Sequence, residues 1–280
     1  MSATEEARAS RERLSRRTIA MLIDDSRVAF VSSLAVGALL WQALGTFVID
    51  PDLISTPARV VAEMYALHAE EALLLPNMYV TLERTFFAMI VTTVIGTGIG
   101  ILAGWNEFTR SMFQDYILVG LGMPTLLAAV FATIWFGPDP ITPTIAGAML
   151  AFPFLALNVK NAVEDIDADL VEMSRSFNVS RQRAFRRLIV MSVLPEWFSG
   201  MRNAYTVTWK IVTVAEFVAF SNGVGFYIAE SVGLFSMDAV LAWTFSFSLI
   251  IIALEYAIFQ TVERRVFAWR QEGRIGVGAL

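Results

Sequence analysis

The stretch Asp167–Pro195, DADLVEMSRSFNVSRQRAFRRLIVMSVLP, is the longest charged interval between two apolar segments of this chain. Asp167 is predicted to cap a first short helix, because its carboxylate can accept the free backbone N–H groups of the first turn. Asn178 tolerates the left-handed conformation in which helices end, so a hinge is predicted there. Ser180 is predicted to cap a second helix, and Pro195 to end it. The stretch therefore predicts a pair of short helices joined at Asn178.

This pair of helices is amphipathic and basic, with five arginines between two apolar segments of membrane length. In the second helix the apolar side chains are expected to lie opposite the basic ones, with Ala184, Phe185, Leu188 and Ile189 on one face and Arg183, Arg186 and Arg187 on the other. A basic helix pair between two membrane spans indicates a docking element on the cytoplasmic side.

The composition excludes several classes of protein. A chain of 280 residues that is 56% hydrophobic is too apolar for a soluble domain of that size. It contains no cysteine, so a disulfide framework and a thiolate metal site are excluded. Its single histidine, His68, cannot form a chelate, so no metal site is expected and a solvated helix face is the preferred interpretation. The N-terminal region does not have the form of a signal peptide.

Six apolar segments are predicted to cross a membrane. The first, Val28–Ile49, has 22 uncharged residues, enough for a hydrocarbon core of about 30 Å. The others are Phe86–Trp105, Tyr116–Phe136, Ile141–Leu157, Trp197–Phe220 and Val240–Gln260, with Asn106–Asp115 as a polar turn. The expected fold class is an all-α membrane protein with six transmembrane helices.

Glycines and prolines within the predicted spans indicate close helix packing and local helix breaks. Gly96, Gly98, Gly100 and Gly104 are spaced for close contact with another helix. Pro124, near the middle of the third span, frees backbone carbonyls, which are tolerated only where protein or a water-filled cavity satisfies them.

The domain organisation follows from these spans. Residues 1–27 form a basic leader, residues 28–49 the first span, and residues 50–84 a periplasmic segment in which Thr56 caps a surface helix, Pro57–Glu70. Residues 85–262 form the membrane core, with the docking helices at 167–195, and residues 263–280 a basic tail.

The distribution of arginine and lysine predicts the orientation. The leader, the Asn106–Asp115 turn, the docking stretch and the tail carry 6, 1, 5 and 4 of these residues, whereas the opposite loops carry Arg59, with Arg84 at an edge. By the positive-inside rule both termini and the docking stretch are cytoplasmic.

No catalytic or nucleotide-binding motif stands out. The Gly-x-Gly sequences at Gly96–Gly100 and Gly223–Gly225 lack the strand-before, helix-after context that phosphate binding requires. Active work by this chain would therefore need an ion gradient or an energy-supplying partner, and the chain is not expected to be an enzyme.

The docking stretch also contains a signature-like pattern, Glu172-Met173-Ser174 followed by Asn178 and by Leu194-Pro195. Further matching sequences include Trp135-Phe136-Gly137, Ala215-Glu216 and Gly223-Val224-Gly225. With these, nearly the whole chain resembles the permease subunits of binding-protein-dependent ABC importers, in particular the group for nitrate, sulfonate, taurine and related solutes. Where the family signature has two alanines and a glycine, this chain has Met173, Ser174 and Asn178. Asparagine can still adopt the turn, whereas Met173 and Ser174 change the surface offered to the ATPase, so the resemblance implies the docking role but not the identity of the ATPase.

The resemblance implies a type I importer permease fold in a bacterial inner membrane. It also implies a second permease subunit, expected to be a second copy of this chain, two cytoplasmic ATPase subunits and an external solute-binding protein, within membrane lipid and without nucleic acid. No cofactor is expected in this chain, because ATP and Mg would be bound by the ATPase. The residues that would contact the ATPase are Asp169, Glu172, Met173, Ser174, Arg175, Phe177, Asn178, Arg181 and Arg183.

A second set of residues is expected to line the translocation path: Met123, Pro124, Arg202, Trp209, Lys210, Glu216 and Phe217. Charges within spans are costly and usually functional. Lys210 could attract an anionic solute or pair with a neighbouring span, and both alternatives stay open. Two other functions also stay open, a gradient-driven carrier, which would have an internal repeat that is not seen here, and a membrane scaffold without a path.

Overall fold

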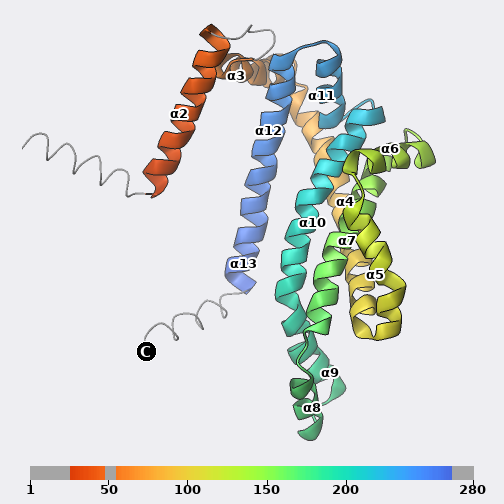
Figure 1. The fold of residues 1–280 in the computed structure, drawn as a ribbon. Coiled ribbons are helices and arrows are strands. Elements are labelled where there is room, and N and C mark those ends of the chain that lie inside the picture. The colour runs from red at the N-terminus through yellow and green to blue at the C-terminus, as the bar shows by residue number, and fades with distance from the viewer. Residues whose placement is uncertain (1–25, 48–54, 267–280) are drawn as a thin grey trace, which may run out of the picture.

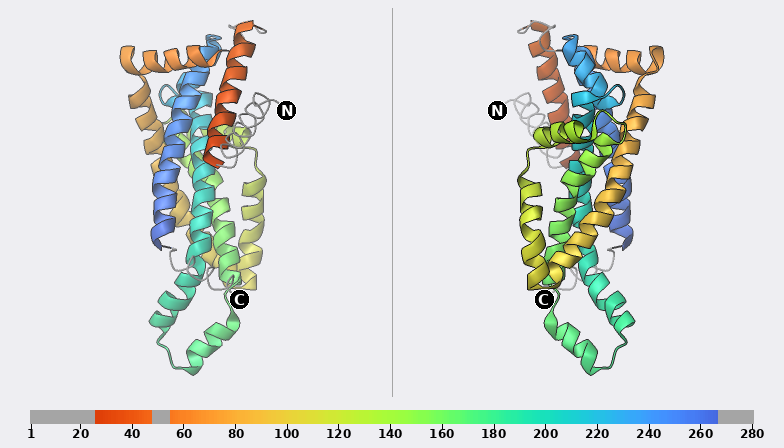
Figure 2. Two further views of the ribbon diagram at one scale, coloured as in Figure 1. Left: turned by 90° about the vertical axis from the view of Figure 1, so that its left-hand side faces the viewer. Right: turned by 90° about the vertical axis from the view of Figure 1, so that its right-hand side faces the viewer.

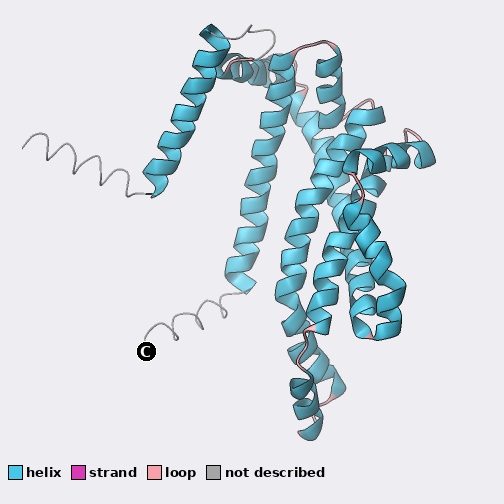
Figure 3. Ribbon diagram, in the orientation of Figure 1, coloured by secondary structure: helices cyan, strands magenta, loops and turns pink. Residues whose placement is uncertain are grey.

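A computed structural model describes residues 26–47 and 55–266, and every regular element within these ranges is a helix (Figure 3). The leader up to residue 25, residues 48–54 and the tail beyond residue 266 lie outside the described residues. The helices are α2 (Ser26–Phe47), α3 (Pro57–Tyr65), η1 (Ala66–Glu70), α4 (Leu74–Trp105), α5 (Glu107–Gly122), α6 (Thr125–Phe136), α7 (Thr142–Glu164), α8 (Ala168–Ser176), α9 (Arg181–Ala184), η2 (Phe185–Ile189), α10 (Val190–Ala219), α11 (Val224–Gly233), α12 (Met237–Glu255), η3 (Tyr256–Gln260) and α13 (Thr261–Val266).

The centre of the molecule consists of three long helices, in which α7 packs along both α4 and α10 (Figure 1). α3 and η1 lie across one end of this bundle, whereas α8 and α9 project from the opposite end as a hairpin (Figure 2). α2 lies apart from the bundle at its side, and nearly all of its side chains are exposed. The predicted docking helices therefore protrude from one end of the bundle.

The contact between α4 and α7 depends on glycines spaced four residues apart. A Cβ at Gly100 would lie 2.6 Å from Val159 Cβ, and one at Gly104 would lie 2.7 Å from Val163 Cβ. Because residues four apart share a helix face, Gly96 makes the same approach to α7 one turn earlier. The prediction of close packing is confirmed at these three glycines, but it is wrong for Gly98, whose Cβ would meet no atom of the described residues within 4 Å.

The predicted spans correspond to helices whose first and last residues differ from the predicted ones. In the described part of the chain, α2, α4, α7 and the segment Met237–Glu263 are long and apolar enough to cross a membrane. α10 is long enough, but it carries Glu196, Arg202, Lys210 and Glu216, so composition alone does not identify it as a span. The count of six spans and the side on which the termini lie stay predictions.

The third predicted span, Tyr116–Phe136, is wrong as a single helix. α5 and α6 meet at 106° on either side of Met123 and Pro124. Pro124 disfavours the helical conformation at the preceding residue, and Met123 is accordingly extended, with φ −72° and ψ 125°. Asn106–Asp115 is also not a turn, because the Asn106 side chain accepts the Thr109 N–H at 2.9 Å and α5 begins directly after it.

Two further boundaries differ from the sequence prediction. α4 begins at Leu74 instead of Phe86, so Arg84 lies inside a helix and not at the edge of a loop. The sequence Gly223-Val224-Gly225 is not an external loop, because α11 begins at Val224. The predicted surface helix Pro57–Glu70 is confirmed as α3 and η1, and the Thr56 hydroxyl accepts the Arg59 N–H at 3.4 Å as its cap.

Substitution of Gly100 by alanine should destabilise the protein by about 1–3 kcal/mol, the usual cost of forcing extra volume into a packed contact. The added methyl group would also approach the Ala156 carbonyl oxygen at 2.7 Å. Gly98→Ala is the matched control on the same helix and should be neutral or stabilising, because alanine favours helix over glycine. Unfolding of the solubilised protein, followed by tryptophan fluorescence, measures the difference, and equal stability of the two variants would contradict the packing role of Gly100.

Candidate functional site

The hairpin formed by α8 and α9 is the predicted docking element, here called the docking hairpin, and it begins as the sequence predicts. The Asp167 carboxylate accepts the Asp169 N–H at 2.9 Å and caps α8. Asn178 has φ +51°, in the left-handed region, and donates its N–H to the Arg175 carbonyl at 2.9 Å. The predicted cap at Asp167 and hinge at Asn178 are both confirmed.

The prediction that Pro195 ends the second docking helix is wrong. α9, the π-helical turn η2 and α10 follow one another without a break from Arg181 to Ala219, and Pro195 lies inside α10. Proline costs one backbone hydrogen bond in a helix interior but does not always end the helix. The hairpin is therefore continuous with a long helix of the bundle, so a displacement of the hairpin can be transmitted directly to α10.

Most of the residues predicted to contact an ATPase present their side chains to solvent. Those at Asp169, Glu172, Met173, Arg175, Phe177, Asn178 and Arg183 are exposed, whereas Ser174 is half-buried and donates its hydroxyl to the Val171 carbonyl at 2.8 Å. Phe177 is 76% exposed, an unusual position for an apolar side chain of that size. Arg181 begins α9, and its side chain lies outside the described part of the structure.

The residues predicted to line a path separate into several groups. Met123 and Lys210 line one cavity of about 250 Å³ at the break between α5 and α6, together with Gly120, Leu121, Thr125, Leu150, Phe154, Val207 and Ile211. Pro124 lies at the break itself, immediately before α6. Lys210 is exposed, and its ammonium lies 5.6 Å from the centre of the Trp209 ring. Within residues 26–47 and 55–266, no carboxylate lies within 4.0 Å of its nitrogen.

The other predicted path residues lie away from this cavity. Trp209 packs its ring on Phe247 of α12, with ring centres 5.9 Å apart. Arg202 pairs with Glu255 at 2.9 Å. Phe217 lies on the surface of α10 and is 41% exposed. From the predicted set, Met123 and Lys210 line this cavity, Pro124 lies at the adjacent break, and Trp209 contacts Lys210 from outside it.

Glu216 is fully buried in an ion pair that sequence analysis did not find. Arg84 Nη1 donates to Glu216 Oε1 at 2.7 Å, and the Thr81 hydroxyl donates to Oε2 at 2.8 Å. The second Arg84 nitrogen donates to Asn222 Oδ1 at 2.7 Å. Glu216 was expected to line the path, but its fully buried carboxylate takes part in a structural ion pair instead. The available signal was Glu216 itself, because an acid within a membrane-length segment requires a partner.

The same network holds the beginning of α11. The first N–H groups of a helix have no partner within the helix, and here the N–H groups of Gly223, Val224 and Gly225 bind Asn77, Thr81 and Glu216 at 2.9–3.1 Å. A Cβ at Gly223 would lie 2.5 Å from the Glu216 carboxylate, and Gly223 has φ +98°, so only glycine fits. Glu216 therefore joins α4, α10 and α11 through hydrogen bonds to Thr81, Arg84 and Gly225.

The sequence was compared with protein families and with known proteins. Residues 96–267 match the family described as "Binding-protein-dependent transport system inner membrane component". SsuC of Bacillus subtilis, a permease protein named for the transport of aliphatic sulfonates, is 24% identical over 84% of this chain and 85% of its own length. The taurine transport system permease protein TauC of Escherichia coli is 23% identical over 86% of this chain and 90% of its own length.

A more distant relative and a solved structure extend this comparison. The formylaminopyrimidine transport permease protein ThiX of Halalkalibacterium halodurans is 22% identical over 84% of this chain and 92% of its own length. The crystal structure of an amino acid ABC transporter superposes with a TM-score of 0.60 at 17% identity, over 72% of this chain and 98% of that one. The latter likeness shows a shared fold.

Replacing Glu216 by leucine should cost about 3–5 kcal/mol of folding free energy, because it leaves the Arg84 guanidinium buried without an opposite charge. The double variant Arg84→Leu/Glu216→Leu should cost less than the sum of the two single variants, since no charge is then left unpaired. The exposed Glu230 of α11 provides the control, and Glu230→Leu should change stability little. Unfolding in mixed detergent micelles measures all four variants. Additive costs at Arg84 and Glu216 would contradict the pairing.

Proposed function

We propose that this chain, which belongs to the family of binding-protein-dependent transport system inner membrane components, forms the translocation path of an ATP-driven importer. The solute is a small organic anion or an oxyanion, delivered from outside by a solute-binding protein. This chain performs no chemical step, and ATP with Mg is bound and hydrolysed by a separate ATPase subunit.

The observation that carries the proposal is Lys210 in the cavity between α5, α6, α7 and α10. Its ammonium has no acidic partner within 4.0 Å in the described residues, whereas Arg202 and Glu216 of the same helix are both paired. An ammonium beside an apolar cavity attracts an anion and repels cations. The sulfonate and taurine in the names of two relatives carry sulfonate groups, which supports an anionic solute here.

The break between α5 and α6 supports the position of the path. Non-helical backbone at membrane depth is tolerated where it is buried in protein or lines a cavity. Met123 and Thr125, on either side of Pro124, both line the cavity that contains Lys210. The solute would therefore pass Met123, Pro124 and Lys210, with Trp209 positioned to stack on the Lys210 side chain.

The hairpin of α8 and α9 is proposed as the contact with the ATPase. Its side chains at Glu172, Met173 and Phe177 are exposed, and exposed apolar side chains of this size mark interaction surfaces. Because α9, η2 and α10 are continuous, movement of the hairpin would tilt the helix that carries Lys210. A second copy of this chain and two ATPase subunits complete the proposed importer.

The test measures ATP hydrolysis in liposomes that contain the chain, its ATPase and its binding protein, with a panel of sulfonates, nitrate and neutral pyrimidines. Lys210→Gln should raise the KM for an anionic solute by roughly tenfold or more, which corresponds to loss of one charge-assisted hydrogen bond. Lys210→Arg keeps the charge and should retain most of the stimulation.

Two outcomes would contradict the proposal. If Lys210→Gln changes the KM of anionic and neutral solutes equally, Lys210 does not select anions. If the ATPase does not associate with the wild-type chain, the proposed coupling through α8 and α9 is wrong.

A further inference from the structure

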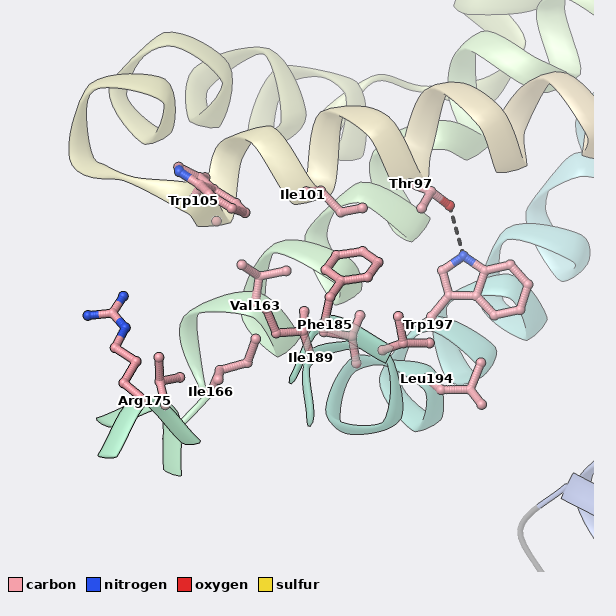
Figure 4. Close-up of a pocket in the computed structure, with 14 residues that line it drawn as sticks. Thr97, Ile101, Trp105, Val163, Ile166, Arg175, Phe185, Ile189, Leu194 and Trp197 are labelled. Carbon is pink, nitrogen blue, oxygen red and sulfur yellow. Dashed lines mark hydrogen bonds between the residues drawn. The ribbon is translucent and has the colours of Figure 1, made fainter. Parts of the chain in front are cut away.

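A large groove lies where the docking hairpin meets the long helices. It has a volume of about 580 Å³, and nine of its fourteen lining residues come from α4, α7 and α10, with the others from α8, η2 and the link between α7 and α8. Figure 4 shows that its side chains are almost all aliphatic or aromatic. The groove therefore lies between the docking hairpin and the helices that enter the membrane.

The groove presents apolar surface that the described residues of the chain do not cover. Trp105, at the end of α4, is 66% exposed, and Phe185, in the π-helical turn η2, is 52% exposed. π-Helical turns are frequent at functional sites, and this one supplies both Phe185 and Ile189 to the groove. At the other end of the groove the Trp197 indole donates to the Thr97 hydroxyl at 2.8 Å, which satisfies the polar atoms there. An apolar ligand fits this lining better than a polar one.

A single basic residue, Arg175, belongs to the lining. Figure 4 shows its guanidinium at the end of the groove beyond Val163 and Ile166, pointing away from the apolar side chains. Among the described residues, no carboxylate lies within 4.0 Å of this guanidinium. Trp105 flanks the same end, and tryptophan is enriched at the level of lipid headgroups.

We propose that this groove binds one acyl chain of an anionic phospholipid, whose phosphate is held by Arg175. The position of the groove favours a lipid chain over a side chain of the ATPase as its occupant, because most of the lining residues belong to helices that continue into the membrane. A guanidinium matches a phosphate in charge and in hydrogen-bond geometry. The orientation rests on the proposed function, in which this end of the bundle is cytoplasmic. A bound lipid would separate the hairpin from α4 and thereby affect how hairpin movement reaches the bundle.

The absence of cysteine makes a site-specific test direct. The single-cysteine variant Val190→Cys, at the exposed rim of the groove, would carry a bimane fluorophore in lipid discs of phosphatidylcholine. Phosphatidylglycerol with brominated acyl chains should quench this label at a mole fraction roughly fivefold lower than brominated phosphatidylcholine, the preference expected from one basic residue at an anionic lipid. The same label at Phe177→Cys, which does not line the groove, should show no such preference.

Matched variants distinguish a specific lipid-binding site from the general attraction of anionic lipid to a basic protein surface. Arg175→Gln should abolish the preference for phosphatidylglycerol, whereas Arg183→Gln, in the same hairpin but outside the groove, should retain it. Ile189→Trp, which fills the groove, should reduce quenching by both lipids.

Equal quenching by the two lipids, or equal losses in Arg175→Gln and Arg183→Gln, would overturn the proposal. Absence of quenching, together with shielding of the label when the ATPase binds, would assign the groove to the ATPase instead. The quenching experiment needs neither solute nor ATP. A negative result would therefore contradict the lipid site without contradicting the transport function, and loss of the transport function would not by itself contradict the lipid site.

Discussion

An ionised side chain inside a membrane protein must find an opposite charge or enough hydrogen-bond partners, and the buried Arg84–Glu216 pair between α4 and α10 meets this requirement. Glu216 also accepts the Gly225 N–H, while Thr81 and Asn77 bind the neighbouring N–H groups of the same helix start. The pair therefore fixes α4 against α10 and holds the beginning of α11. Without Glu216, the buried Arg84 guanidinium would have no opposite charge, and the Gly225 N–H would lose its carboxylate partner.

Lys210 lies six residues from Glu216 on the same helix, but in a different environment. Glu216 is enclosed by α4 and α11, whereas Lys210 is exposed beside a cavity that opens where α5 and α6 are broken. The break leaves a space because Pro124 turns the chain, and the glycine contacts between α4 and α7 keep the neighbouring helices close. The bundle thus places the Lys210 ammonium beside a helix break, and no carboxylate of the described residues lies in contact with it.

Local chemistry was predictable from the sequence, and distant pairing was not. Asp167 and Asn178 act through their own backbone neighbours, so a cap and a hinge could be read directly. Prolines were ambiguous, because Pro124 lies at a helix break whereas Pro195 lies inside a helix, and residue type alone does not distinguish the two cases. The pairing of Glu216 with Arg84 joins residues 132 positions apart, and single-sequence reasoning contains no information on that distance.

We propose that the cavity at Met123 and Lys210 belongs to a path that opens alternately to the two sides of the membrane. Met123→Cys would carry the only thiol of the chain, so a membrane-impermeant thiol reagent can report access to the cavity in liposomes containing the ATPase and binding protein. Alternating access predicts labelling from the ATPase side without nucleotide and from the opposite side in the ATP-trapped complex. Labelling from one side in both states, or from neither, would contradict it.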